Sequence, residues 1–177
     1  APPTLTPMGA RLLKQWLESP LTDISTIQRR QAAVAELISR NGERCEIQSY
    51  LDCIYDFERI VGRIETGSVS PRDFTSLRES LQVLPQIKNL LKEFSGLSLS
   101  SINTRIDNHA DIYDLLNRAI AEQPALTLKD GRVIRDGYNE ELDELRSLAT
   151  NSEVWLQKLE DKAREETGLK LKTKVGN

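Results

Sequence analysis

Three lysines near the end of the chain, Lys170, Lys172 and Lys174, are the residues whose type and spacing most directly suggest a chemical role. They alternate along the sequence, so in an extended conformation they would project from one face about 6.6–6.8 Å apart. A row of cations at this spacing can follow the phosphates of a DNA backbone, giving position and salt-dependent affinity but no base preference. A solubilising chain end is the alternative interpretation of the same residues.

Catalytic and metal-binding chemistry finds little support in the sequence. His109 is the only histidine, and no nucleophile or second histidine accompanies it, so we expect a polar helix start there and not a hydrolase site. Cys45 and Cys53 lie eight residues apart, too far for neighbouring helical turns and without histidines to complete a zinc site. We therefore expect no catalytic residues, no metal site and two reduced thiols.

A phosphate-binding loop is also not indicated. Gly62 and Gly67 have the spacing of the glycines in such a loop, but the Lys and Ser/Thr that should follow are missing. We expect Gly62 to lie in a helix and Gly67 to end it.

The composition predicts a protein with no general affinity for polyanions. The 24 basic and 27 acidic residues give a net charge of −3, so no global positive field would attract DNA or anionic lipid. No uncharged apolar run approaches the ~18 residues of a membrane span, and the N-terminus has no basic region before an apolar run. We expect a cytoplasmic protein that does not bind membranes.

Apolar periodicity and capping signals predict a mainly α fold, an irregular helical bundle. The clearest helix starts are Thr6 with Pro7, Asp23, and Ser70 with Pro71. Pro85 should kink or break the fifth helix near Leu84, and a Ser/Gly-rich connector should follow it. The predicted helices cover residues 7–19, 24–40, 43–53, 56–66, 71–93 and 109–121, with the connector at 95–103.

One small β-hairpin is expected near residues 125–137. ALTLKDGRVIRDG alternates apolar and polar residues around Asp130-Gly131. This pair suits a two-residue type I′ turn, because both turn positions need a positive φ.

A very long helix is expected over residues 139–168. Asn139 is a plausible cap, and no proline or glycine follows before Gly168, which leaves about 28 residues or roughly 40 Å of helix. Its apolar positions alternate spacings of three and four, the pattern of a coiled-coil seam that needs a partner helix. The seam consists of Leu142, Leu145, Ala149, Ser152, Leu156, Leu159 and Ala163.

Five segments of the sequence carry a family likeness: TPMGARLLKQWLESPL, DFERIVGRI, SVSPRDFTSLRESL, DGRVIRDGYNEELDELRSLA and REETGLK. They cover nearly the whole chain, and in kind and order they resemble segments of the MutS family of DNA mismatch repair proteins. The resemblance implies a helical core domain at residues 1–138, a protruding lever helix at 139–168 and the start of a truncated clamp strand at 169–177. The chain is thus expected to be a piece of a longer protein, cut where the clamp begins.

The resemblance further implies a role in coupling a DNA clamp to a distant ATPase during mismatch repair. Its implied partners are mismatched duplex DNA, a second MutS subunit and a MutL-type protein, and ATP and Mg are implied for the full-length protein. The family's mismatch-reading Phe-x-Glu motif and its Walker-type ATPase are not in this segment. We therefore expect that the segment is not an enzyme by itself and holds no cofactor.

The seam alone leaves a second hypothesis open. A free-standing helical adaptor could use the same apolar stripe to bind a helix of another protein. Dimerisation through residues 142–163 would favour the adaptor, whereas a monomer with a frayed distal helix would favour a piece of a longer protein.

Overall fold

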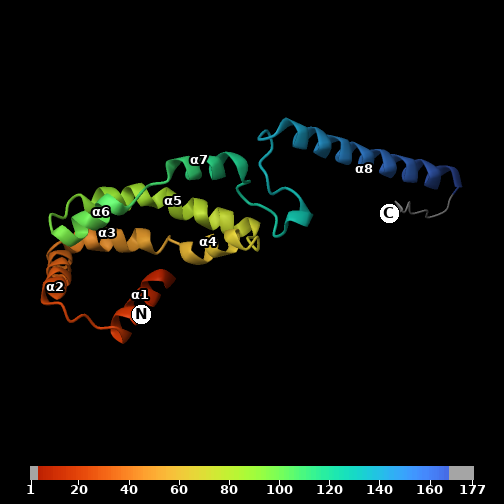
Figure 1. Ribbon diagram of the computed structural model, residues 1–177. Coiled ribbons are helices and arrows are strands. Elements are labelled where there is room, and N and C mark those ends of the chain that lie inside the picture. Colours follow the sequence, from red (N-terminus) through yellow and green to blue (C-terminus); the bar gives the residue numbers. More distant parts are fainter. Residues whose placement is uncertain (1–3, 168–177) are drawn as a thin grey trace. The chain divides into compact units, whose positions relative to one another are not determined.

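The computed structural model describes residues 4–167, apart from the side chains at 152–154, 157–160, 163, 166 and 167 (Figure 1). This range contains eight α-helices and one 3₁₀ turn, so the prediction of a mainly α fold is confirmed. None of these helices is long and apolar enough to cross a membrane. The elements are α1 Pro7–Glu18, α2 Ile24–Ser39, α3 Asn41–Leu51, α4 Phe57–Glu65, α5 Pro71–Leu91, α6 Leu97–Arg105, α7 Ala110–Ala119, η1 Leu128–Asp130 and α8 Glu140–Thr167.

The predicted helix starts are built as the cap residues require. Thr6 Oγ1 accepts from the Gly9 amide at 3.0 Å, and Pro7 occupies the first turn, where its missing N–H costs nothing. Ser70 and Asp73 form a reciprocal capping box at the start of α5, each side chain accepting from the other's backbone amide. Local sequence therefore sets where these two helices begin.

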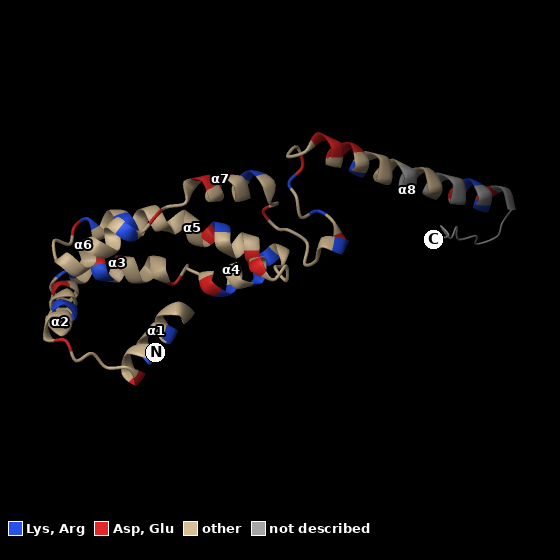
Figure 2. Ribbon diagram, viewed as in Figure 1, with Lys and Arg blue, Asp and Glu red and all other residues tan. Residues whose placement is uncertain are grey.

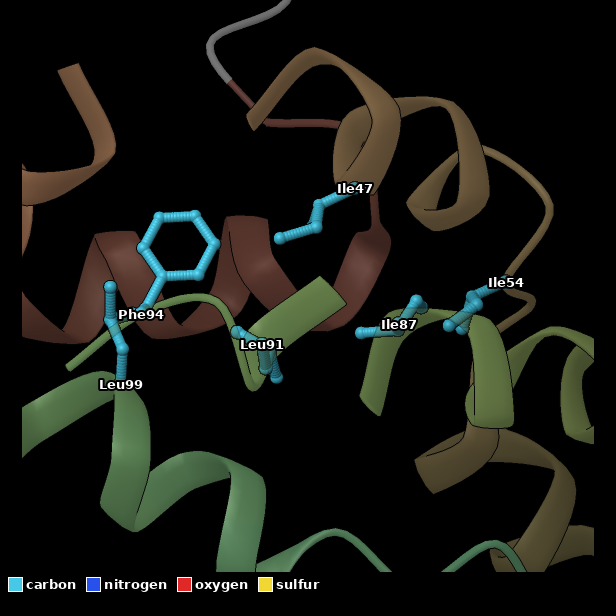
Figure 3. Packing of buried hydrophobic residues seen from close by; sticks show 6 residues of the cluster. All are labelled: Ile47, Ile54, Ile87, Leu91, Phe94 and Leu99. Carbon is cyan, nitrogen blue, oxygen red and sulfur yellow. The ribbon is translucent and has the colours of Figure 1, made fainter. Parts of the chain in front are cut away.

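The chain divides into two compact units between Arg135 and Asp136. In the first unit, α5 is the central helix and contacts α3, α4, α6 and α7. Its largest cluster of buried side chains joins α3, α5 and α6 (Figure 3). Full burial of each such side chain contributes about 1.5–3 kcal/mol. The buried members are Ile47, Ile54, Ile87, Leu91, Phe94 and Leu99.

A second cluster attaches α7 and the segment after η1 to the middle of α5. Leu81 of α5 packs with Leu116 and Ile120 from the end of α7 and with Val133, and all four are less than 8 % exposed. The segment around Val133 is therefore part of the core of the first unit.

The predicted connector at residues 95–103 is wrong, because α6 occupies most of it. Leu99 is buried in the first cluster, and Glu36 of α2 supplies the cap that the local sequence lacks. Glu36 Oε1 accepts from the amides of Ser95 and Gly96 at 2.7 and 3.0 Å. A carboxylate at a helix N-terminus satisfies free amides and interacts favourably with the helix dipole. This helix start therefore depends on a residue about sixty positions away.

Pro85 does not end α5, which continues to Leu91. The proline removes one hydrogen bond of the helix, a local cost of about 3 kcal/mol. Ile87 and Leu91 lie beyond it and are both buried in the first cluster. Their burial offsets the local cost, so the helix continues through the proline.

The predicted hairpin at residues 125–137 is wrong, and no strand is present within residues 4–167. Asp130 lies in η1, and its carboxylate accepts from Thr127 N and Oγ1 at 3.2 and 2.8 Å, which closes a capping box. The positive φ values fall on Gly131 and Arg132, one position later than a type I′ turn at Asp130-Gly131 requires.

The apolar residues after this turn pair with the end of α7 and not with residues 125–128. The Ala121 amide donates to Val133 O at 3.0 Å, and the Arg135 amide donates to Ala119 O at 2.8 Å. These two bonds surround an isolated antiparallel bridge between Ile120 and Ile134. Ile134 thus takes part in one isolated bridge, and its partner lies 14 residues earlier in the sequence and not in the predicted hairpin.

Candidate lever helix and its base

The long helix α8 begins where the sequence predicts. Asn139 Oδ1 accepts from the Leu142 amide at 2.9 Å, which is the bond of an N-cap residue. Glu140, Glu141 and Asp143 lie in the first turn, where negative charge is favoured by the helix dipole. Figure 2 shows this acidic start of α8.

Hydrogen bonds and an ion pair tie Asp136 and Gly137, which precede α8, to the first turns of the helix. Arg146 Nη1 lies 2.8 Å from Asp136 Oδ1 and 3.6 Å from Asp143 Oδ1. The Gly137 amide donates to Asp143 Oδ2 at 2.7 Å. Gly137 has a φ of 81°, in the left-handed region that favours glycine. The segment from Asp136 onward is thus folded onto the first turns of α8.

The predicted seam of α8 is only partly covered. Leu142 and Leu156 are half-buried, Leu145 is 58 % exposed, and Ala149 is also exposed. Trp155, at the edge of the same stripe, is 62 % exposed. The side chains of the other seam residues, Ser152, Leu159 and Ala163, lie outside the described residues.

The three lysines proposed to follow a phosphate backbone, Lys170, Lys172 and Lys174, lie outside the described residues, as does the terminal clamp strand. Their role stays a prediction. Acidic side chains at the base of α8 would repel a phosphate backbone there.

His109 takes the N-cap position of α7 with a φ of 46°, but its side chain makes no capping bond. Its amide donates instead to Asp107 Oδ1 at 3.1 Å, and this bond lowers the pKa of Asp107. Gly62 lies within α4 and Gly67, with a φ of 68°, follows the helix end, as expected. Cys45 and Cys53 are free and exposed.

No cluster of three or more His, Cys, Asp or Glu side chains suited to a metal ion occurs among the described residues. One open hollow of about 680 Å³ lies beside the start of α5 and residues 122–126. Tyr55 and Glu79 face each other there, and the negative charge of Glu79 raises the pKa of Tyr55. No histidine or cysteine lines it.

An ion-pair group links α1 to the start of α4. The guanidinium of Arg11 binds both carboxylate oxygens of Asp56 at 2.7 and 2.8 Å and also reaches Glu58. These hydrogen bonds lower the pKa of Asp56 and raise that of Arg11. Because Asp56 is also the N-cap of α4, one carboxylate joins two helices.

Two arginines that follow Asp56 form ion pairs with acidic side chains. Arg59 pairs with Asp56 at 3.5 Å, and Arg63 pairs with Asp73 at 2.7 Å. Arg78 differs, since its Nη1 donates to Ile120 O at 3.1 Å and contacts Ala121 O at 3.5 Å.

Sequence reasoning missed three of these contacts: Arg11 with Asp56, Arg78 with Ile120, and Glu36 at the start of α6. The contacting residues lie 42 to 60 positions apart. No periodicity or local spacing connects residues at such separations.

The chain is similar to a described domain and to several known proteins. The sequence pattern of MutS domain III matches residues 3–169. The DNA mismatch repair protein MutS of Caldanaerobacter subterraneus subsp. tengcongensis is 46 % identical over 167 residues, which cover 94 % of this chain and 19 % of that protein. The corresponding protein of Geobacillus thermodenitrificans is 44 % identical over 176 residues, 98 % of this chain and 19 % of the relative. That of Bacillus subtilis is 41 % identical over 173 residues, again 98 % of this chain and 20 % of the relative. The chain spans about a fifth of the length of these relatives.

Proposed function

Because the chain belongs to the MutS family, as its segment motifs predict, we propose that it is the core and lever part of a DNA mismatch repair protein. In this proposal α8 transmits force between a clamp that grips DNA and a distant ATPase. The expected partners of the full-length protein are mismatched duplex DNA, a second MutS subunit and a MutL-type protein. ATP and Mg would act at the ATPase, outside this chain.

The observation that carries the proposal is the exposed apolar stripe of α8. The helix has 28 residues, yet Leu145 and Trp155 are 58 % and 62 % exposed on it. Full burial of a leucine contributes about 1.5–3 kcal/mol, so covering Leu145 by a second helix would add roughly 1–2 kcal/mol. The proposed cover is an antiparallel helix from a segment outside these 177 residues.

A lever also needs an end that is held and an end that moves. The bonds of Asn139, Asp143 and Arg146 lie within residues 136–146 and order the acidic base of α8. Repulsion from phosphates makes this base the end that faces away from DNA. The proposal therefore places the clamp at the distal end of α8.

The test replaces Leu145 and Leu156 with serine in the full-length protein. Loss of seam burial should leave basal ATP hydrolysis unchanged and should reduce its stimulation by mismatched DNA. Two partly buried leucines contribute together about 2–3 kcal/mol, so we expect stimulation to fall by at least tenfold.

The matched control replaces Ser147 and Thr150 with alanine. Both are exposed side chains on the opposite face of the same helix, and alanine preserves its helical propensity. Mismatch-stimulated hydrolysis should stay normal in this variant. Normal stimulation in the double-serine variant as well would refute a mechanical role for the seam.

A further inference from the structure

The boundary between the two units falls at a single peptide bond whose neighbouring residues are held by different units. Arg135 is held by the first unit: its amide donates to Ala119 O at 2.8 Å, and its Nη2 contacts Ile120 O at 3.5 Å. Asp136 is held by α8 through Arg146, at 2.8 Å. No linker residue separates the two attachments, because Arg135 and Asp136 are consecutive.

Both attachments are themselves supported. On the side of the first unit, Arg78 of α5 donates to Ile120 O at 3.1 Å, and Val133 is 6 % exposed in the second core cluster. On the side of α8, the Gly137 amide donates to Asp143 Oδ2 at 2.7 Å. The last residue held by the first unit, Arg135, and the residues held by α8, Asp136 and Gly137, are therefore neighbours in the sequence.

We infer that Arg135–Gly137 is the pivot of the lever helix, with the Asp136–Arg146 ion pair as its latch on the helix side. Only the description of α8 as a lever rests on the proposed function; the pivot itself follows from the contacts of residues 135–137. Rotation of α8 against the first unit is limited to the few backbone torsions between the Arg135 amide and the Gly137 amide. Gly137 suits this position because its φ of 81° is strained for other residues.

The ion pair reduces this freedom further. Asp136 is 90 % exposed, and its bond to Arg146 is what holds the carboxylate in place. Held by that bond, the backbone of Asp136 follows α8. Without it, the backbone of Asp136 loses this restraint, and the bond from the Gly137 amide to Asp143 remains.

The experiment measures distances between spin labels on the two units of the 177-residue chain. Cys45 and Cys53 are exposed and are replaced with serine, and labels are attached through Asn117→Cys on α7 and Asn151→Cys on α8, both exposed positions. A second pair, Asn117→Cys with Glu65→Cys, lies within the first unit and reports whether that unit stays intact.

Three glycines are inserted either between Asp136 and Gly137 or between Gly131 and Arg132. A three-glycine segment adds about 10 Å of flexible reach, so the first insertion should widen the distance distribution between units about twofold or more. The second should leave it unchanged, because the bonds of Val133 and Arg135 still hold the chain after it. Equal widening by both insertions, or widening by neither, would overturn the pivot.

The latch has a separate test in Asp136→Ala. This variant should widen the distribution between units, though less than the glycine insertion at the pivot. Glu141→Ala, which removes an exposed carboxylate from the first turn of the same helix, should not widen it. An unchanged width in Asp136→Ala would overturn the latch. These measurements use neither DNA nor nucleotide, so they stand or fall separately from the role of α8 in mismatch repair.

Discussion

Ser80→Ala tests how α4 and α5 are held together. Ser80 has no exposed surface, and its Oγ makes two hydrogen bonds. It accepts from the Tyr55 amide at 2.9 Å and donates to Ser76 O at 2.7 Å. Tyr55 lies just before the cap of α4, so this hydroxyl connects the approach to α4 with the middle of α5.

The substitution removes one oxygen and leaves the Tyr55 amide without its acceptor. An amide left without a partner costs about 1–3 kcal/mol, whereas the small change in volume adds little. We expect the free energy of unfolding to fall by about 2 kcal/mol, or Tm by about 4–8 °C for a chain of this size. Urea unfolding followed by circular dichroism measures the first quantity, and thermal melts measure the second.

The matched control is Ser76→Ala, which keeps the carbonyl that Ser80 uses and removes only a half-buried hydroxyl. It should change stability by no more than about 0.5 kcal/mol. Hydrogen exchange adds a local readout, because the Tyr55 amide should lose protection in Ser80→Ala alone. Unchanged stability together with retained protection of that amide would refute the reasoning.

Two further predictions concern helix starts. A Cβ at Gly96 would collide with the carboxylate of Glu36, so Gly96→Ala should break the cap of α6 and lower the stability by about 1 kcal/mol, measured by urea unfolding. The control is Gly42→Ala in α3, where a Cβ meets open space and alanine favours the helix, so the stability should not fall. The pKa of Asp23 is lowered from 3.8 to about 2, chiefly by hydrogen bonds from Thr26 and Ser25. The resulting stabilisation is present above pH 3.8 and is lost as the pH falls towards 2. In Asp23→Asn, which keeps a cap without a charge, the deficit in Tm relative to the unmodified chain should shrink between pH 5 and pH 2, and a constant deficit would contradict a stabilising role for the charge of Asp23.

The elements that were predicted correctly are those whose signals are local. Ser70 and Asp73 are three residues apart, and the capping box that they form needs no contact beyond α5. Asn139 likewise caps α8 with its own side chain. The starts of these helices can be predicted from the sequence because each capping side chain and the backbone amide that donates to it lie within one helical turn.

The errors fall where a distant residue changes the outcome. The serine-rich segment of α6 has no cap of its own, and Glu36 of α2 provides one. Asp130-Gly131 satisfies the composition of a type I′ turn, yet Asp130 is used to cap η1 and Val133 pairs with the end of α7. The preference of a short sequence for one backbone conformation is weak. Hydrogen bonds to distant residues, together with burial, contribute more free energy than that preference and decide the conformation.

For the candidate lever, the sequence alone determined the family, the mainly helical fold and the length and apolar stripe of α8, because motifs, caps and periodicity are properties of neighbouring residues. Only the tertiary structure decided what anchors the helix base. Arg135 and Asp136 are adjacent in the chain, but their partners, Ala119 and Arg146, lie 16 and 10 positions away on opposite sides. Chain folding alone brings these groups into contact, and the contacts define residues 135–137 as the pivot in the proposed mechanism.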